Sequence, residues 1–335
     1  MKQPEADIIV IGAGVSGLTT AICLAEAGAG VTVWTAEPTT ETTSMAAGAM
    51  WGPYLVQPLD RVDAWSTHTL AVLRDLANDV RTGVRLVSGI EASRGAVEAP
   101  AWGGQLDGFR MCEPHELPAN FSTEWRYTAP LVEMPIYLEY LRRRLTGSGG
   151  VIQRRRVSAL AEATREVGIV VNCAGMGARD LVDDRKIVPV RGQLVVMKNP
   201  GLHEFFSEDT GASPDLTHWY PYGDTVVLGG TAQPDVWNRG PDPAVAMAII
   251  RRCAEIEPRF DDAEVLAHRV GLRPTRDPVR VEEESTTGAR IIHNYGHGGA
   301  GVTLSWGCAA DVAELALVPR SQRAQRPPRR RGARP

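Results

Sequence analysis

Residues 8–18, IIVIGAGVSGL, limit the possible folds of this chain more than any other stretch. Four β-favouring apolar residues predict a buried strand, and the helical periodicity after the turn predicts a helix that ends before Gly28. Between them the glycines follow the spacing G-x-G-x-x-G. In this pattern Gly12 allows a tight turn, Gly14 lets the backbone approach a pyrophosphate, and Gly17 lets the helix pack close to the sheet.

A second strand at residues 31–34 and the acidic Glu37 beyond it complete the pattern. In a βαβ unit of this kind, the phosphates of a dinucleotide lie against free N–H groups at the positive end of the helix dipole. The acid binds a ribose hydroxyl. The order strand, turn, helix, strand and acid therefore predicts a bound dinucleotide. The alternative is a glycine-rich turn that holds no ligand.

Two later segments repeat this logic. Residues 169–179, IVVNCAGMGAR, predict another buried strand and glycine turn at the carboxyl edge of the same sheet, where open α/β sheets bind ligands. Residues 290–307 combine a strand, a glycine loop and a helix that begins near Thr303. The N-terminus of that helix would stabilise negative charge on a bound ring.

The remaining sequence mixes both kinds of element, which suggests two interleaved domains. Residues 84–130 are predicted to form short strands and loops. Helical periodicity marks residues 62–78, 134–145 and 244–256, and strands are predicted at residues 151–157, 188–197, 224–230 and 265–270.

Charge and length restrict the function. The chain has 335 residues, enough for one large or two medium domains. The net charge is −4, but residues 319–335 hold seven arginines and no acid, so the rest carries −11 and offers nucleic acid no basic face. The arginines alternate with proline and glutamine, which predicts a disordered basic tail. The alternative for this tail is a contact with nucleic acid or a membrane.

The sequence contains no recognisable export signal or membrane span. The N-terminus leads directly into the first strand, and no apolar run reaches the roughly 18 residues that a span needs. The five cysteines form no C-x-x-C pair and lie mostly among apolar residues, which indicates buried thiols in a reducing compartment. No His/Cys cluster has metal-ligand spacing. We therefore expect a cytoplasmic protein without a bound metal ion.

Together the motifs resemble those of the D-amino-acid oxidase family, whose members are FAD enzymes that deaminate D-amino acids. The resemblance runs from residue 7 to about residue 316. Its most specific part is HNYGHGG, followed by GVTL and WGCA, whereas the first glycine motif alone is not specific. The matching stretches are residues 12–18, 46–54, 171–179, 191–193, 228–231, 271–274 and 293–299.

The resemblance implies an α/β fold of mixed (α+β) character. In it, a Rossmann-type FAD-binding domain is interleaved with a mixed-sheet substrate-binding domain. The FAD-binding domain would comprise residues 1–60, 135–185 and 271–318, and the substrate-binding domain residues 61–134 and 186–270.

The implied reaction is oxidative deamination of D-amino acids, with neutral or hydrophobic side chains expected. Hydride transfer from Cα–H to flavin N5 would lead to a 2-oxo acid and ammonia, and O2 would be reduced to H2O2. Such a reaction depends on alignment, because the cofactor carries the chemistry. The alternatives are a D-aspartate or glycine oxidase, a flavin dehydrogenase with another electron acceptor, NAD in place of FAD, and an inactive flavin-binding protein.

The implied partners are a D-amino acid and O2, without nucleic acid or membrane, and a homodimer is the expected assembly.

Arg273 falls on the family's arginine that grips the substrate carboxylate, which a planar guanidinium matches bidentately. The alternative is a structural arginine before a proline. Gly299 falls on the glycine whose carbonyl oxygen accepts the substrate amine. Arg273 and Gly299 are the catalytic candidates, and Tyr54 joins them as a substrate-binding candidate.

Two positions depart from the family pattern. Where the family usually carries a tyrosine that binds the carboxylate, this chain has His218. Tyr220 or Tyr222 is the alternative donor, and His218 could equally be a plain loop histidine. Ala36 stands where an acid is common, and Glu37 follows it, so the ribose ligand is left open. His218 and Tyr220 are therefore added to the substrate-binding candidates.

The residues expected to contact FAD come from the glycine turns, from the segment after the second strand and from the adenosine contacts Val157 and Ala174. They are Gly12, Ala13, Gly14, Val15, Ser16, Gly17, Glu37, Thr42, Thr43, Ala47, Gly48, Ala49, Met50, Val157, Ala174, Gly175, Gly298, Ala300, Gly301, Val302 and Thr303.

Overall fold

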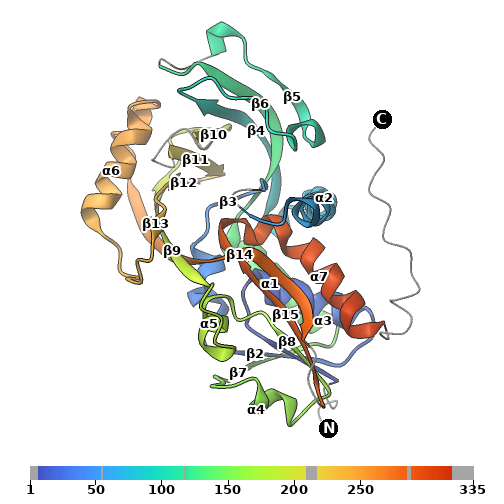
Figure 1. Cartoon of the computed structure of the whole chain (residues 1–335). Coiled ribbons are helices and arrows are strands. Elements are labelled where there is room, and N and C mark those ends of the chain that lie inside the picture. Colours follow the sequence, from blue (N-terminus) through green and yellow to red (C-terminus); the bar gives the residue numbers. More distant parts are fainter. Residues whose placement is uncertain are drawn as a thin grey trace.

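The computed structural model describes residues 7–53, 56–116, 118, 120–208, 217–284 and 288–318. Across these residues one large mixed sheet runs through the molecule with helices packed on it, which confirms the predicted mixed α/β class (Figure 1). The candidate Tyr54 and the basic tail, residues 319–335, lie outside the described residues.

A group of parallel strands forms the lower part of the sheet in Figure 1. β1 (Ile8–Ile11) lies between β2 (Val31–Thr35) and β8 (Ile169–Asn172). β7 (Val151–Arg154) lies beyond β2, and β15 (Arg290–His297) lies beyond β8. Apolar side chains on both faces suit such buried parallel strands. Their carboxyl ends meet at one edge, so the glycine turns after β1, β8 and β15 come together there.

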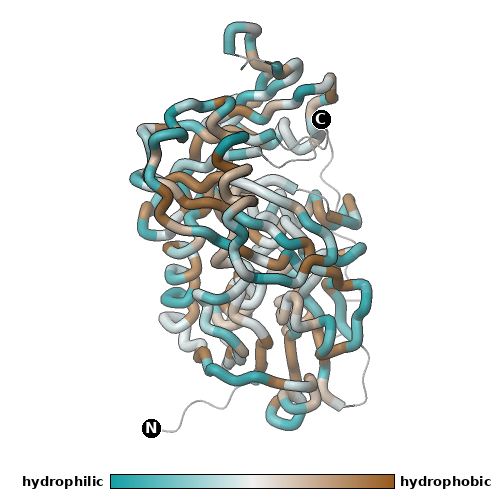
Figure 2. Tube along the Cα trace, turned by 90° about the vertical axis from the view of Figure 1, so that its left-hand side faces the viewer, coloured by the Kyte–Doolittle hydropathy of each residue, from teal (hydrophilic) through white to brown (hydrophobic). Residues whose placement is uncertain are grey.

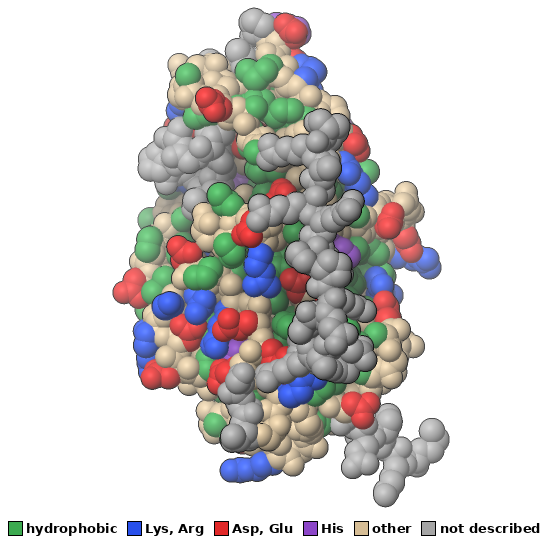
Figure 3. Space-filling model, turned by 45° about the vertical axis from the view of Figure 1, so that its right-hand side comes forward, with side chains coloured by type: hydrophobic (Ala, Val, Ile, Leu, Met, Phe, Trp, Pro, Cys, Tyr) green, Lys and Arg blue, Asp and Glu red, His purple; other side chains and the backbone are tan. Residues whose placement is uncertain are grey.

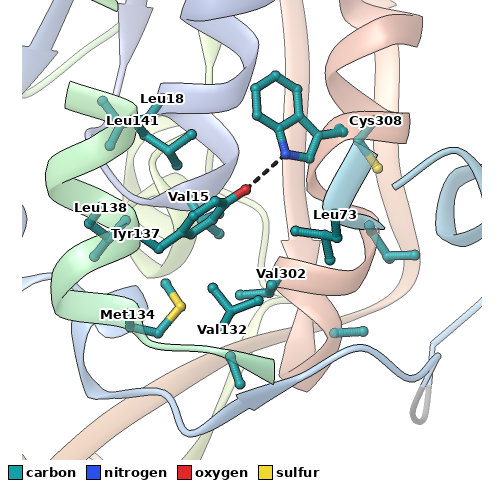
Figure 4. Close-up of a cluster of buried hydrophobic side chains, with 14 of the residues drawn as sticks. Val15, Leu18, Leu73, Val132, Met134, Tyr137, Leu138, Leu141, Val302 and Cys308 are labelled. Atoms are coloured by element: carbon teal, nitrogen blue, oxygen red, sulfur yellow. Dashed lines mark hydrogen bonds between the residues drawn. The ribbon is translucent and has the colours of Figure 1, made fainter. Parts of the chain in front are cut away.

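Helices cover this part of the sheet. α1 (Val15–Glu26) packs against α3 (Met134–Gly147) and α7 (Gly301–Leu317), and α2 (Leu59–Leu76) packs against α7. Figure 4 shows the buried cluster where side chains of these four helices point toward one another. This cluster fixes the start of α1 and the start of α7 relative to each other.

One polar pair stabilises the same cluster. The Trp306 indole N–H donates to the Tyr137 hydroxyl at 2.8 Å, the dashed line in Figure 4. Complete burial raises the pKa of Tyr137 well above its ordinary value. The pair is therefore neutral and hydrogen-bonded, as buried aromatic polar groups need to be.

The upper part of the sheet is mainly antiparallel and carries α6 (Pro243–Ala254) on its outer face. From the edge inward, neighbouring strands follow the order β3-β6-β4-β10-β11-β12-β9. Their bounds are β3 (Ala49–Met50), β6 (Thr123–Val132), β4 (Val84–Ser93), β10 (Phe205–Glu208), β11 (Thr217–Tyr222), β12 (Thr225–Gly229) and β9 (Val188–Lys198), with β5 (Asp107–Met111) on β6 and β13 (Gln233–Pro234) on β9.

β14 (Val265–Glu284) joins the two parts. Its first half pairs with β9 and its second half with β15. The sequence predicts a strand only at residues 265–270, because glycine and proline in the following stretch are weak strand formers. The register with β9 nevertheless continues to Thr275. The residues GLRP at positions 271–274 therefore lie within a strand that spans both parts of the sheet.

The prediction of short strands for residues 84–130 is wrong in length, since β4 and β6 pair over ten residues each. The division into two domains stays a prediction; α2, from the expected substrate-binding segment, packs against α7.

The remaining short elements are α4 (Ala161–Thr164), α5 (Ala178–Leu181) and the 3-10 helices η1 (Thr39–Glu41), η2 (Thr43–Ala46), η3 (Val80–Thr82), η4 (Gly103–Gln105), η5 (Pro114–Glu116), η6 (Gly175–Gly177), η7 (Pro258–Phe260) and η8 (Gly298–Ala300).

Hydropathy and surface charge agree with this arrangement. Figure 2 shows hydrophobic segments in the strands and hydrophilic segments in many peripheral loops. On the face shown in Figure 3, basic and acidic side chains are interspersed. Within the described ranges, none of the helices combines the length and the apolar character that crossing a bilayer requires.

Candidate active site

A cavity of about 1230 Å³ connects the two parts of the sheet. Its wall includes the loops after β1, β2, β8 and β15 and side chains of β4, β9, β10, β11 and β14. A volume of this size exceeds the usual range for one small ligand, roughly 300–1,000 Å³. We refer to the part beside the parallel strands as the cofactor end and to the part beside the antiparallel strands as the substrate end.

Glycines shape the cofactor end. Gly12 has φ +109°, and a Cβ atom there would lie 2.4 Å from the carbonyl oxygen of Cys173. A Cβ atom at Gly17 would lie 1.9 Å from the carbonyl oxygen of Gly12. The turn, β8 and α1 thus approach one another more closely than any side chain allows. Gly17 contributes through this packing and does not itself line the cavity.

Two helix N-termini face the cavity, those of α1 and α7. The cavity wall includes Val15 and Ser16 of α1 and Gly301 and Val302 of α7. Neither helix has an acidic residue in its first turn, so neither carries a carboxylate of its own that offsets the positive end of its dipole. Backbone cradles and uncompensated helix N-termini fit the FAD that the sequence predicts, because its pyrophosphate and its reduced ring are both anionic.

Most cofactor candidates line this cavity, and four of the described ones are not part of its wall: Gly17, Ala49, Ala300 and Thr303. The Thr303 hydroxyl exchanges hydrogen bonds with the backbone of Gly52, at 3.0 Å to the carbonyl oxygen and 3.2 Å from the amide. The residues that line it are Gly12, Ala13, Gly14, Val15, Ser16, Glu37, Thr42, Thr43, Ala47, Gly48, Met50, Val157, Ala174, Gly175, Gly298, Gly301 and Val302.

Glu37 lines the cavity but already has a cationic partner. Its carboxylate lies 3.2 Å from Nη1 of Arg239, and Nη2 of the same arginine donates to the carbonyl oxygen of Glu41. A second arginine, Arg155, stacks 3.6 Å from the ring of Trp34 on β2. Both arginines therefore belong to the cofactor end, near the expected ribose and adenine.

A buried histidine that sequence reasoning missed connects the two glycine loops. His297 Nε2 lies 3.0 Å from Oδ1 of Asn294, and its Nδ1 lies 3.4 Å from the Ser16 hydroxyl. Burial lowers the pKa of His297 to about 4, so the imidazole is neutral. The amide oxygen only accepts, hence Nε2 carries the proton and Nδ1 accepts from Ser16. The available signal was the second histidine of HNYGHGG.

Arg273 reaches the cavity across a glycine of the neighbouring strand. Its Nη1 donates to the carbonyl oxygen of Thr231 at 2.8 Å. A Cβ atom at Gly192 on β9 would lie only 2.5 Å from that Nη1. The guanidinium therefore lies directly over β9, in space that only glycine leaves open. This gives Gly192 a role in the RGQ stretch that the sequence alone did not reveal.

The side chain of His218 on β11 likewise lies over a glycine of the neighbouring strand. His218 pairs with Gly229 of β12, where a Cβ atom would lie 2.0 Å from the imidazole. The ring stacks on Tyr220 with centroids 4.6 Å apart, and both side chains line the cavity. Tyr222, the other tyrosine considered, donates its hydroxyl to the carbonyl oxygen of Ala49 at 3.2 Å. The structure therefore brings His218 and Tyr220 together with Arg273 and Gly299 around one cavity.

Side chains of β4, β6 and β10 complete the substrate end, and sequence reasoning missed them. Glu91 of β4, Ser207 of β10 and Trp125 of β6 line the cavity. The Tyr127 hydroxyl donates to Glu91 Oε2 at 2.5 Å. These residues belong to no motif, and only the strand register places them beside the glycine loops.

Comparisons with known proteins agree with this geometry. The family model DAO, described as FAD dependent oxidoreductase, matches residues 7–315. The chain is 48% identical over 313 residues to the D-amino-acid oxidase of Rubrobacter xylanophilus, covering 93% of this chain and 96% of that protein. It is 45% identical over 317 residues to the D-amino-acid oxidase of Streptomyces coelicolor, covering 94% and 98%. A glycine oxidase from Geobacillus kaustophilus has the same fold, with a TM-score of 0.78 at 20% identity over 92% of this chain and 94% of that one.

Proposed function

This chain belongs to the FAD-dependent oxidoreductase family, and from that premise we propose that it oxidises D-amino acids. A D-amino acid, O2 and water give a 2-oxo acid, ammonia and H2O2. The predicted likeness to D-amino-acid oxidases and the predicted cofactor FAD are confirmed by the family match and by the relatives. Bound FAD supplies acceptance of two electrons and their transfer to O2.

At the cofactor end, different segments would hold different parts of the FAD. Backbone N–H groups at the start of α1 would hold the pyrophosphate, with Ser16 fixed by His297. The start of α7, behind Gly298 and Gly299, would hold the ring and favour its negative charge on reduction. Thr303 supports this arrangement from behind, because it ties α7 to the backbone of Gly52.

The observation that carries the proposal is the guanidinium of Arg273, held over Gly192 inside the cavity that the glycine loops line. A planar cation at this place suits a substrate carboxylate. The carbonyl oxygen of Gly299 would accept from the amine, and the two contacts together would orient Cα–H toward the cofactor end. His218 lines the same space and stands where the family's tyrosine is expected.

We further propose that acidic D-amino acids are disfavoured. A second carboxylate would need a second cation. Among the described residues of the cavity wall, the arginines are Arg155, Arg156, Arg239 and Arg273. Arg155 and Arg239 are engaged at the cofactor end, and Arg156 follows Arg155 beyond β7. Arg273 would bind the substrate carboxylate, and Glu91 would repel an acidic side chain.

An anaerobic visible spectrum of the purified protein tests the function. We expect flavin bands that bleach on addition of a pool of D-amino acids and persist with the L pool, and H2O2 release after air is admitted. Bands that persist with both pools would contradict the proposed substrate class. Bleaching without H2O2 would favour a dehydrogenase with another electron acceptor.

Two finer predictions from the sequence accompany this proposal, a homodimer and a cytoplasmic location. Light scattering on the holoprotein tests the first, with a mass near twice the 36.2 kDa of the chain expected. Fractionation of the native cell tests the second.

A further inference from the structure

Three residues of the substrate end lie side by side on neighbouring strands. Glu91 of β4 is opposite Ser207 of β10, and Ser207 is opposite His218 of β11. Directly opposed residues project from the same face of a sheet. All three are less than 10% exposed, and all three line the cavity. The row therefore forms one continuous piece of the cavity wall that ends in a carboxylate.

The middle of this row is open. The imidazole of His218 leans over Gly229, toward β12 and away from β10. Ser207 has the smallest side chain of the three. Space above Ser207 therefore leads from the region of Arg273 and His218 to Glu91, which is consistent with the presence of all four residues in one cavity wall.

Charge complementarity decides what this space accepts. The Tyr127 hydroxyl holds the carboxylate of Glu91 in place at 2.5 Å. The substrate carboxylate would occupy Arg273 at the other end of the row. A ligand with an anionic head and a cationic tail matches this pair of charges, whereas an anionic tail meets repulsion at Glu91.

The distance between the two charges selects a long tail. The guanidinium lies over β9, and Glu91 is on β4, four strands away in the order β9-β12-β11-β10-β4. Four steps of about 4.8 Å put the guanidinium roughly 19 Å from the strand position of Glu91, and the Glu91 side chain shortens this distance. A short side chain anchored at Arg273 stays far from Glu91, and a long extended one approaches it.

We propose that Glu91 is a specificity-determining residue that favours D-amino acids with a long side chain ending in a cation, such as D-lysine or D-arginine. The inference rests on the proposed oxidation of D-amino acids and names a substrate class for that same site. It also modifies the expectation of neutral or hydrophobic substrates, because the far end of the cavity carries a carboxylate.

The test compares kcat/KM for D-lysine and for D-norleucine, which has a similar chain without the amine. In the unchanged holoenzyme we expect D-lysine to be favoured. In Glu91→Gln we expect kcat/KM for D-lysine to fall about tenfold or more, the scale of a charge-assisted contact, with D-norleucine changed less than about twofold. D-glutamate should gain activity in the same variant.

Glu124→Gln is the matched control. Glu124 is equally buried on β6 but is next to Trp125, whose side chain lines the cavity, so the Glu124 side chain projects from the other face of the sheet. We expect its D-lysine to D-norleucine ratio to stay that of the unchanged enzyme. Ser207→Leu is a second, independent test. The leucine side chain would fill the space above position 207, and this should lower turnover of D-lysine far more than that of D-alanine.

The outcomes separate the inference from the function. Turnover of D-norleucine with an unchanged D-lysine to D-norleucine ratio in Glu91→Gln, together with an unchanged D-lysine to D-alanine ratio in Ser207→Leu, would overturn the role of Glu91 and leave the oxidase function standing. A preference for D-norleucine over D-lysine in the unchanged enzyme would do the same. Flavin bands that bleach with none of these substrates would instead overturn the proposed function. If Glu91→Gln fails to bind FAD, the D-lysine to D-alanine ratio in Ser207→Leu decides.

Discussion

The two ends of the cavity are built from different materials. The cofactor end is mainly backbone: glycines at positions 12 and 17 bring a turn, a strand and a helix together, and two helix N-termini face the cavity. The substrate end is made of side chains, with Arg273, His218 and Glu91 on separate strands. Glycine is essential to both, but it lets backbone segments pack closely at one end and makes room for a neighbouring side chain at the other.

This difference teaches where each end is vulnerable. A side chain added at Gly12 or Gly17 collides with main-chain atoms. A side chain added under Arg273 meets the tip of a flexible side chain, which can move away from it. Substitutions should therefore abolish cofactor binding at the first end and alter substrate binding at the second.

The largest effect is expected for Gly17→Val. Its Cβ atom would lie 1.9 Å from the carbonyl oxygen of Gly12, so β1 and α1 must separate. We expect the purified protein to lack flavin absorbance and to unfold at a clearly lower temperature. Gly147→Ala is the control, because a Cβ atom there meets nothing within 4 Å. Normal FAD content in Gly17→Val would refute the close packing of the turn.

A second test uses pH to probe the cofactor end. The pKa of His297 is about 4 in the folded protein, below the ordinary value of 6.5. As pH falls from 6.5 to 4 the unfolded chain binds this proton and the folded one does not, so stability is lost in that window. The shift corresponds to about 3 kcal/mol. Urea unfolding at pH 7 and pH 4 should show this loss, and His297→Gln should remove it from the pH profile.

The matched control for this measurement is His268→Gln. His268 lies on the exposed part of β14, so its replacement should leave the pH profile of the parent protein unchanged. If His297→Gln and the parent lose the same stability between pH 7 and pH 4, the neutral buried state of His297 is wrong.

At the substrate end, Arg273→Lys should preserve FAD binding and impair catalysis. An ammonium is a point charge and lacks the fork that meets two carboxylate oxygens. We expect kcat/KM for D-alanine to fall about 100-fold, equivalent to about 2.7 kcal/mol, with KM raised sharply and kcat lowered. Steady-state kinetics on flavin-replete enzyme measures this. Unchanged kinetics with D-alanine would remove Arg273 from the site.

The same contrast explains what the sequence could predict. The first strand, the glycine turn and the helix are contiguous, so IIVIGAGVSGL predicted their structure and the dinucleotide from local pattern alone. Glu91, Ser207 and His218 come together through the register of β4, β10 and β11, which no local pattern encodes. Local pattern also predicted that the strand ends at residue 270. In the structure β14 continues through Arg273, because its pairing with β9 extends that far. The family resemblance named Arg273, but the role of Gly192 required the pairing of β9 with β14.

Gly192→Ala gives the smallest effect and the sharpest comparison with Gly17→Val. The added Cβ atom would lie 2.5 Å from Nη1 of Arg273, and the guanidinium can move away from it. We expect FAD content and thermal stability to stay near those of the parent, while KM for D-amino acids rises about tenfold, equivalent to about 1.4 kcal/mol. A double variant with Arg273→Lys should show little further loss, because the two changes act on one contact. If the single variant instead loses FAD, glycine at the substrate end would serve the backbone as it does at the cofactor end, and the contrast between the two ends would fail.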